Sequence, residues 1–459
     1  MFTQIIAEYC VDLDFDELPE EVIKKAKTNI LDSVGCTIGG YKTDIGRIIT
    51  KVIKRLGGKP ESTLMGSGVR VSCVHAAFVN SLLNNALDYD DCFKGHAGST
   101  IVPPSIAVGE PIGASGRDLI TAVVVAYEII GRIATAMEPS KEHTSKVLGL
   151  GTYQTFGSVI AASKLLSLTK DQVISALGIA GANAPVPSVR KTSLNLLGAG
   201  MVKNNYGTAS EVGVMAALMA KEGFSGPRDI LDGDTGFWRW YSDRCDFKKM
   251  TKGLGKEYQI LETRYKAYST CWFHHPPIDA ALHILRENKI DLDKIEKIKI
   301  GTFSQALEPP HDVIEVKSMV DVQQSLKCSL ALALSGLKPG LDWFADDAFK
   351  NPKITEIAKK IEFVVDTEAE ESYPPNMMAY VEMSVEGETY YTRVNYLKGE
   401  PTTPMIRDEL REKFMRLTSY LETSKVKRIM NMINNFEKIK DIRDLTPLLC
   451  ARPARAKNS

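Results

Sequence analysis

The sequence predicts a mostly α-helical protein that carries a smaller α+β part within it. Apolar residues recur at helical spacing through the first part of the chain, strand-like patterns follow Lys266, and helical spacing returns at Arg407. At 459 residues the chain is long enough for more than one domain. We therefore expect an all-helical domain built from residues 1–266 and 397–459, with an inserted α+β lid domain of residues 267–396.

Six helices are expected before Lys266. Pro19 and the two glutamates after it suit a first helical turn, because proline needs no N–H partner there and acidic groups favour a helix N-terminus. Thr169 and Gln172 have capping-box spacing and predict another helix start. The expected helices cover residues 19–39, 71–87, 119–136, 156–166, 169–181 and 211–222. No strand is expected in this part of the chain.

Strands are expected in the second part of the chain. Ile298 and Ile300 alternate with lysines, and residues 361–365 form a β-branched run. Residues 379–385 and 389–394 flank Glu386-Gly387-Glu388, which predicts a hairpin. Helices are expected at 277–287, 322–334 and, packed back on the first domain, 407–436, and residues 452–459 are expected to form a frayed tail.

The composition excludes several classes of function. The chain has 57 basic and 57 acidic side chains, whereas a nucleic-acid binder needs a surplus of cations. The longest apolar run, 119–130, is shorter than the ~20 residues of a membrane span. The N-terminus has no basic region or cleavage site of a secretory signal, so a cytoplasmic protein is expected. The eight cysteines include no CxxC pair, so neither a disulfide framework nor a cysteine metal cluster is expected.

One cluster of polar residues follows the expected helix at 71–87. Asp88, Asp91 and His96 lie within nine residues, together with Cys92. Carboxylates at a helix C-terminus oppose the helix dipole, and we expect Asp88 and Asp91 to share a helix face, where crowding raises the pKa of one of them. Such a group and a loop histidine suit acid–base catalysis. The alternative is a solvated acidic helix end with a chance histidine.

A second cluster lies near Lys266, where helical spacing of apolar residues gives way to strand-like patterns. Lys266, His274 and His275 stand among aromatic residues at the expected domain seam, where ligand sites are often built. These groups suit an anionic substrate. Adjacent histidines point in different directions, and HExxH spacing is absent, so no metal site is expected. Lys203, just before the helix at 211–222, is a third candidate, although a lysine at a helix entrance is more often a surface residue.

Several stretches in order along residues 18–414 resemble the MmgE/PrpD family, which includes 2-methylcitrate dehydratases, cis-aconitate decarboxylases and an iminodisuccinate epimerase. The stretches are Leu18-Pro-Glu-Glu-Val22, Leu31-Asp-Ser-Val-Gly35, Asn85-Ala-Leu-Asp-Tyr-Asp-Asp91, Ala161-Ala-Ser-Lys-Leu-Leu166, Ala176-Leu-Gly-Ile-Ala-Gly181, residues 216–227, Lys266-Ala-Tyr268, His275-Pro276, Asp279-Ala-Ala281, Gly399-Glu-Pro401 and Lys413-Phe414.

The resemblance implies a helical domain from both chain ends, an α+β lid, a homodimer and a site between the domains without an organic cofactor. Carried over residue by residue, it implies catalytic roles for Asp88, His96 and His275. Substrate binding is implied for Lys203 and Lys266, the former across a one-residue alignment gap. Asp91 and Cys92 are added as neighbours expected to contact substrate.

The chain also departs from the family pattern. Cys92 stands where the family often has threonine, and Ala97 replaces the proline that usually follows the histidine at position 96. Residues 147–154 lack the histidine often found there, and Asn204-Asn205-Tyr206 replaces Leu-His-Pro. Two expected site histidines are therefore absent, which argues against decarboxylation of cis-aconitate and leaves the substrate open.

The function predicted from these residues is a cofactor-independent lyase, dehydratase-like, that abstracts a proton next to a carboxylate of a small di- or tricarboxylate. Lysines would hold the carboxylates, because ammonium groups offset the charge that develops when a proton leaves carbon. The alternatives are an epimerase or isomerase of an amino- or imino-dicarboxylate, a cis-aconitate-type decarboxylase, and a non-catalytic paralogue that keeps only the fold.

Overall fold

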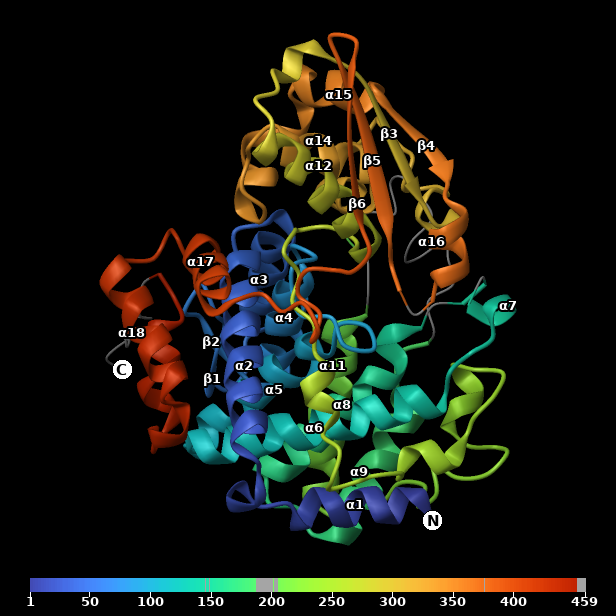
Figure 1. Cartoon of the computed structure of the whole chain (residues 1–459). Helices are drawn as coiled ribbons and strands as arrows, with labels where there is room; N and C mark the ends of the chain where they lie inside the picture. The colour runs from blue at the N-terminus through green and yellow to red at the C-terminus, as the bar shows by residue number, and fades with distance from the viewer. Residues whose placement is uncertain (145, 148, 187–200, 202–204, 375, 452–459) are drawn as a thin grey trace.

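The computed structural model describes residues 1–459 apart from residues 145, 148, 187–200, 202–204, 375 and 452–459. Helices dominate it, and a single four-stranded sheet lies with its own helices on top of a larger helical body (Figure 1). The prediction of a mostly α-helical fold is confirmed. The predicted tail at 452–459 lies outside the described residues.

The helical body packs around long apolar helices from the first half of the chain. Its helices are α1 (Phe2–Asp12), α2 (Glu20–Gly40), α3 (Asp44–Leu56), α4 (Cys73–Asn85), α5 (Ala97–Ile112), α6 (Gly116–Ala136), α7 (Lys141–Thr144), α8 (Leu150–Leu165), α9 (Lys170–Asn183) and α11 (Tyr206–Lys221). The predicted capping box is present, since Thr169 accepts from the Gln172 backbone N–H and Gln172 accepts in return from Thr169. Among the described residues, α6 alone has the length and composition of a membrane span, but 94% of that window is buried inside the protein. It is therefore the central helix of this body.

The expectation of no strand in this half was wrong. Two short strands, β1 (Ser62–Thr63) and β2 (Arg70–Val71), pair antiparallel at its edge. Helices α1, α3 and α5 were not predicted from the sequence either. For α5 the reason is plain, because it contains three prolines, which normally argue against a helix, and yet it is almost wholly buried.

The upper part contains the predicted strands. They are β3 (Ile295–Thr302), β4 (Ile361–Val365), β5 (Ala379–Val385) and β6 (Glu388–Val394), in the order β4-β3-β5-β6. The predicted hairpin between β5 and β6 is confirmed, with Glu386 and Gly387 both at positive φ, as a tight two-residue turn requires. The helices beside the sheet are α12 (His275–Glu287), α13 (Met319–Gln324), α14 (Leu326–Leu334), α15 (Pro352–Lys359) and α16 (Thr367–Ser372). The single helix expected at 322–334 is broken at Ser325, whose side chain caps α14.

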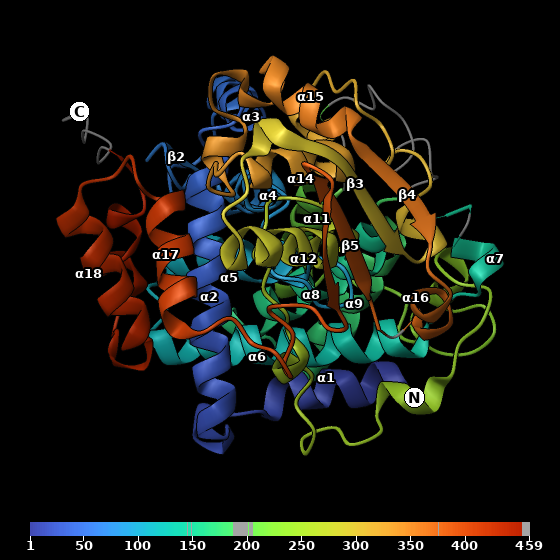
Figure 2. The same cartoon turned by 45° about the horizontal axis from the view of Figure 1, so that its top comes forward.

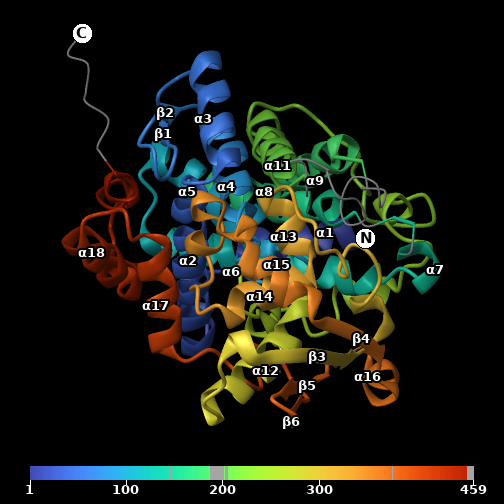
Figure 3. The same ribbon diagram turned by 90° about the horizontal axis from the view of Figure 1, so that it is seen from above.

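The C-terminal helices α17 (Arg407–Leu417) and α18 (Thr423–Asn434) lie beside α2 in all three views (Figures 1, 2 and 3). A Cβ atom at Gly35 would lie 2.8 Å from the Phe414 ring, and one at Gly39 would lie 2.8 Å from a Leu417 methyl group. The two glycines therefore let α17 approach α2 closely. The domain limits 1–266 with 397–459, and 267–396, stay a prediction.

Candidate active site

A cavity of about 690 Å³ lies between the helical body and the upper part of the protein. Four of the residues singled out from the sequence line it: Asp88, Cys92, His96 and Lys266. Side chains of the upper part, including Phe273, His311 and Gln324, form the opposite wall. Cavities of this size, with a few convergent polar groups, are the usual form of small-molecule sites.

The candidate residues after α4 lie on a loop rather than on a helix. Helix α4 ends at Asn85, and Asp88 has a φ of 49°, a left-handed conformation that no helix continues. The expectation that Asp88 and Asp91 share a helix face was therefore wrong. The loop ends at His96, the residue that precedes α5. The three carboxylates of this loop have different partners: Asp88 contacts Lys266, Asp90 contacts His96, and Asp91 contacts Gly98.

Asp88 is paired with Lys266, which lies far away in the sequence. Lys266 Nζ donates to Asp88 Oδ1 at 2.7 Å and to the Asp88 backbone carbonyl at 3.1 Å. An antiparallel backbone bridge between Cys92 and Arg264 joins the segment that contains Asp88 to the segment that contains Lys266. Burial by itself lowers the pKa of the Lys266 amine, but Asp88 and Asp90 outweigh it and raise the pKa above its ordinary value. Lys266 is therefore a buried ammonium group at the cavity wall.

His96 is held by Asp90, which the sequence analysis did not single out. The Nδ1 atom of His96 lies 3.1 Å from both carboxylate oxygens of Asp90. Ser99 and Asn85 also donate to this carboxylate. Burial raises the pKa of Asp90, but His96 and Lys266 outweigh it and hold the pKa below its ordinary value. An anionic Asp90 fixes the imidazole, leaving its Nε2 on the cavity side, 3.7 Å from Asp88 Oδ1.

Asp91 is not among the residues that line the cavity, and its role in substrate binding stays a prediction. Its Oδ1 accepts from the Gly98 backbone N–H at 2.9 Å, and its Oδ2 accepts from the Tyr127 hydroxyl. Both partners belong to the core of the helical body, so the side chain ties the loop to α5 and α6. Burial, together with the neighbouring Asp90, raises the pKa of this carboxyl to about 7.

Cys92 and His275 differ in their relation to the cavity. Cys92 lines it as a thiol, because burial raises its pKa to about 12. His275 is fully buried at the start of α12, against the rings of Tyr268 and Trp272, and does not line the cavity. Burial, with Lys266 nearby, holds the pKa of His275 well below its usual range. Its two ring nitrogens have no hydrogen-bond partner among the described residues. Lys203 lies outside the described residues.

Tyr206 is a further polar group that the sequence analysis missed. Its ring centroid lies 5.5 Å from that of His96, and its buried hydroxyl has no hydrogen-bond partner within the part of the chain that the structure describes. A signal was available, because Tyr206 occupies the last of the three positions where the chain departs from the Leu-His-Pro pattern. Asp90 could have been found from its position between Asp88 and Asp91 in the acidic cluster that follows α4.

Among the residues that the structure describes, two groups of side chains have the residue types and the proximity of metal ligands: Asp88 with Asp90 and His96, and Cys271 with His274 and His311. In the first group the Lys266 ammonium already lies on the Asp88 carboxylate, where a cation would bind. In the second, His274 Nε2 and His311 Nδ1 lie 2.9 Å apart, and Thr270 and Ser329 contact the other nitrogen of His274. Hydrogen bonds thus use the atoms that a metal would need.

Lys266, His96 and Asp88 together form a set suited to proton transfer beside a carboxylate. The ammonium group offers charge-assisted hydrogen bonds to an anionic substrate. The imidazole, oriented by Asp90, presents one nitrogen toward the cavity for general acid or base work. The Asp88 carboxylate lies beside both groups.

Comparison with known proteins shows the family of the chain. Residues 4–250 match the MmgE/PrpD N-terminal domain, and residues 268–438 match the MmgE/PrpD C-terminal domain. A cis-aconitate decarboxylase of Homo sapiens is 26% identical over 97% of this chain and 94% of that protein. A cis-aconitate decarboxylase of Aspergillus terreus is 24% identical over 97% and 95%. A mitochondrial 2-methylcitrate dehydratase of Yarrowia lipolytica is 23% identical over 83% and 76%. The chain belongs to the MmgE/PrpD family.

Proposed function

We propose that this protein is a cofactor-independent lyase that removes a proton next to a carboxylate of a small tri- or dicarboxylate and then expels a leaving group. The observation that carries the proposal is the placement of the Lys266 ammonium and the His96 imidazole on one cavity wall. Its family relatives are named as decarboxylases and a dehydratase, which supports lyase chemistry on a tricarboxylate.

Lys266 would bind a carboxylate of the substrate. Its ammonium group is kept charged by Asp88 and retains donor capacity, because an ammonium has three N–H groups. As the proton leaves the adjacent carbon, negative charge spreads onto that carboxylate, and the ammonium stabilises it. Gln305 and Gln324, also on the cavity wall, are of a type to orient the other carboxylates. Lys203 stays a proposed second cation.

His96 and Asp88 would carry the proton transfer. We assign the proton abstraction to His96 Nε2, because Asp90 holds the opposite ring nitrogen and stabilises the imidazolium that forms. Asp88, 3.7 Å away, would relay a proton to the leaving group. In a dehydration, the carbon–hydrogen bond gives its proton to His96, a C=C bond forms, and the hydroxyl leaves as water after protonation. His275 stays a proposed alternative acid.

Decarboxylation is the second candidate function, because the relatives at 26% identity bear the name cis-aconitate decarboxylase. In that reaction a carbon–carboxylate bond breaks, CO₂ leaves, and a proton is delivered to the substrate carbon. The same three side chains would serve. We favour the dehydratase because the sequence lacks two histidines that the family often has.

A panel of acids followed by proton NMR in D₂O tests the proposal. The panel contains citrate, methylcitrate, cis-aconitate and aspartate-like acids, each with the native protein and with His96→Gln. Loss of water supports the dehydratase, and loss of CO₂ supports the decarboxylase. Exchange of a carbon-bound proton without net turnover would replace the lyase by an epimerase. No exchange with any acid would overturn the proposal in favour of a non-catalytic paralogue.

We also propose that the protein works as a homodimer, as the family resemblance implies. Light scattering of the purified chain tests this directly, since a monomeric mass at assay concentration would contradict it.

A further inference from the structure

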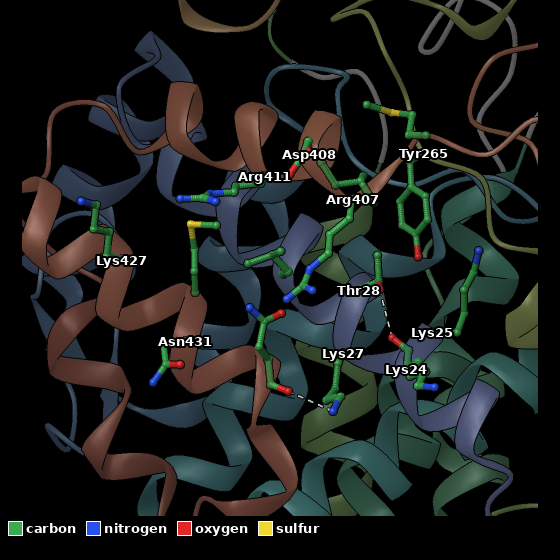
Figure 4. Close-up of a pocket in the computed structure, with 15 residues that line it drawn as sticks. Lys24, Lys25, Lys27, Thr28, Tyr265, Arg407, Asp408, Arg411, Lys427 and Asn431 are labelled. Carbon is green, nitrogen blue, oxygen red and sulfur yellow. Dashed lines mark hydrogen bonds between the residues drawn. The ribbon is translucent and has the colours of Figure 1, made fainter.

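A second, larger hollow of about 870 Å³ lies between α2, α17 and α18, with Tyr265 in its lining (Figure 4). We call it the basic groove. Its lining shares no residue with that of the active-site cavity. Six cationic side chains line it, against a single carboxylate, Asp408. The cations are Lys24, Lys25, Lys27, Arg407, Arg411 and Lys427.

Three of these cations are already partnered within the protein. Lys24 is paired with Glu20 at 2.6 Å, and Lys27 donates to the Asn434 carbonyl and to Glu437, both at 3.0 Å. Lys25 donates to the Thr263 carbonyl at 2.6 Å and lies over the Tyr265 ring. Burial lowers the pKa of Lys25 to about 8. These contacts fix the α2 wall of the groove.

The other three cations have no such partner. Arg407, Arg411 and Lys427 make no hydrogen bond or ion pair with any residue that the structure describes. Arg407 reaches from α17 toward α2, while Arg411 extends toward α18 (Figure 4). Arg407 and Arg411 stand one helical turn apart, where like charges destabilise a helix by a few tenths of a kcal/mol.

This local charge stands out against the whole chain, whose basic and acidic residues balance at 57 each. The groove is also lined by the apolar side chains of Leu31, Met405 and Met430 and by the amides of Asn431 and Asn434. A concave site of several hundred cubic ångströms with both apolar and cationic lining residues fits a small molecule better than a flat protein surface. Arginine is the residue best suited to bidentate binding of phosphate or carboxylate groups.

We propose that the basic groove is a second ligand site of this protein, for a small molecule with clustered anionic oxygens, held by Arg407, Arg411 and Lys427. The ligand's anionic groups lie between α17 and α18, and its apolar part contacts Met405 and Met430. Polyphosphates and polycarboxylates share this chemistry. The site is independent of the proposed lyase reaction, because no groove residue faces the catalytic cavity.

Calorimetry on the full chain at ~0.15 M salt, where surface electrostatics are screened, tests the proposal. The probes are inorganic tripolyphosphate and citrate, each titrated into native protein, Arg411→Gln and Arg407→Gln. We expect at least one probe to bind, and its affinity to fall about tenfold or more in each variant, as for a lost charge-assisted hydrogen bond. The probe that shows this sensitivity identifies the ligand as phosphate-bearing or carboxylate-bearing.

Two controls locate the binding. Arg428→Gln removes the same charge from α18 at an exposed position that does not line the groove, so binding should stay unchanged. Asp88→Asn/Lys266→Met removes the ion pair of the active-site cavity without leaving a lone buried carboxylate, and it should also leave groove binding intact. The proposal is overturned if neither probe binds at this ionic strength. It is also overturned if Arg428→Gln weakens binding as much as the groove variants do, because the effect would then be one of general charge. Loss of binding in Asp88→Asn/Lys266→Met alone would place the anion in the active site.

Discussion

Lys266 Nζ lies 2.7 Å from Asp88 Oδ1, although 178 positions separate the two residues in the chain. Both side chains are almost wholly buried. A buried ion pair is a costly element to maintain for stability alone, since apolar residues of similar volume often serve as well. Because the pair lies at the cavity wall beside His96, we propose that it serves the chemistry of the site rather than stability.

The first prediction concerns proton transfer. Asp88→Asn and His96→Gln should each lower kcat by ~10²–10⁴-fold, because positioned acid–base groups contribute about that much. The double variant should lose much less than the product of the two, since the pair acts as one unit. Steady-state kinetics on the best acid of the panel measures this, with His283→Gln, at an exposed position of α12, as the control. Near-normal kcat in both single variants would move the proposed base to His275.

The second prediction concerns anion binding in the active site. Lys266→Met should weaken binding of the polycarboxylate by at least ~1.5–3 kcal/mol, the range of a charge-assisted hydrogen bond. Calorimetry measures it, with the surface lysine variant Lys297→Met as control. Lys203→Met is expected to behave like Lys266→Met.

Lys266→Met leaves the Asp88 carboxylate buried without its cation, so the variant is at risk of unfolding. Asp88→Asn/Lys266→Met removes both charges and provides a folded reference. If either folded protein binds the acid as tightly as the native chain, Lys266 does not contact the substrate.

The third prediction concerns pH and Asp91. The folded protein holds this carboxyl at a pKa of about 7, against 3.8 for the ordinary group, because it is buried. Between those two pH values the unfolded chain has released the proton while the folded chain keeps it. The raised pKa therefore lowers stability as pH rises through this window, by roughly 4 kcal/mol at most at about 1.4 kcal/mol per pKa unit.

Asp91→Asn cannot ionise and should escape this loss. The melting temperature of the variant minus that of the native protein should therefore rise by at least ~2 °C between pH 5 and pH 8. Differential scanning calorimetry across this range checks it, with the exposed Asp12→Asn as control. A difference that stays flat, or falls with pH, contradicts the raised pKa.

The fourth prediction concerns metals. Activity should survive exhaustive chelation, because the Lys266 ammonium occupies the cation position on Asp88, and His274 and His311 are hydrogen-bonded to each other. Turnover is compared before and after treatment with a chelator, and again after addition of divalent ions. Activity that is lost on chelation and restored by one ion would refute this assignment and make the two histidine-containing groups the first places to search.

The local structure of much of the chain could be predicted from sequence. The capping box at Thr169 and the turn at Glu386-Gly387 depend on neighbours within a few residues, and both are present. The spacing of apolar residues predicted α2 and α6 for the same reason, because the residues of one buried helix face recur every three or four positions in the sequence. Helix α5 was not predicted because its three prolines locally disfavour a helix. Burial of the segment in the folded protein outweighs this local preference.

Residue patterns alone were enough to predict the helical class, the resemblance to the family and the clusters that contain Asp88, His96 and Lys266. Tertiary structure decided the pairing of side chains: Asp90 rather than Asp91 meets His96, and Asp91 turns into the core. It also assembled the basic groove from helices at opposite ends of the chain. The physical reason is that helix and turn formation depends on near neighbours, whereas a side chain's partner depends on which distant segment the fold brings within hydrogen-bond distance.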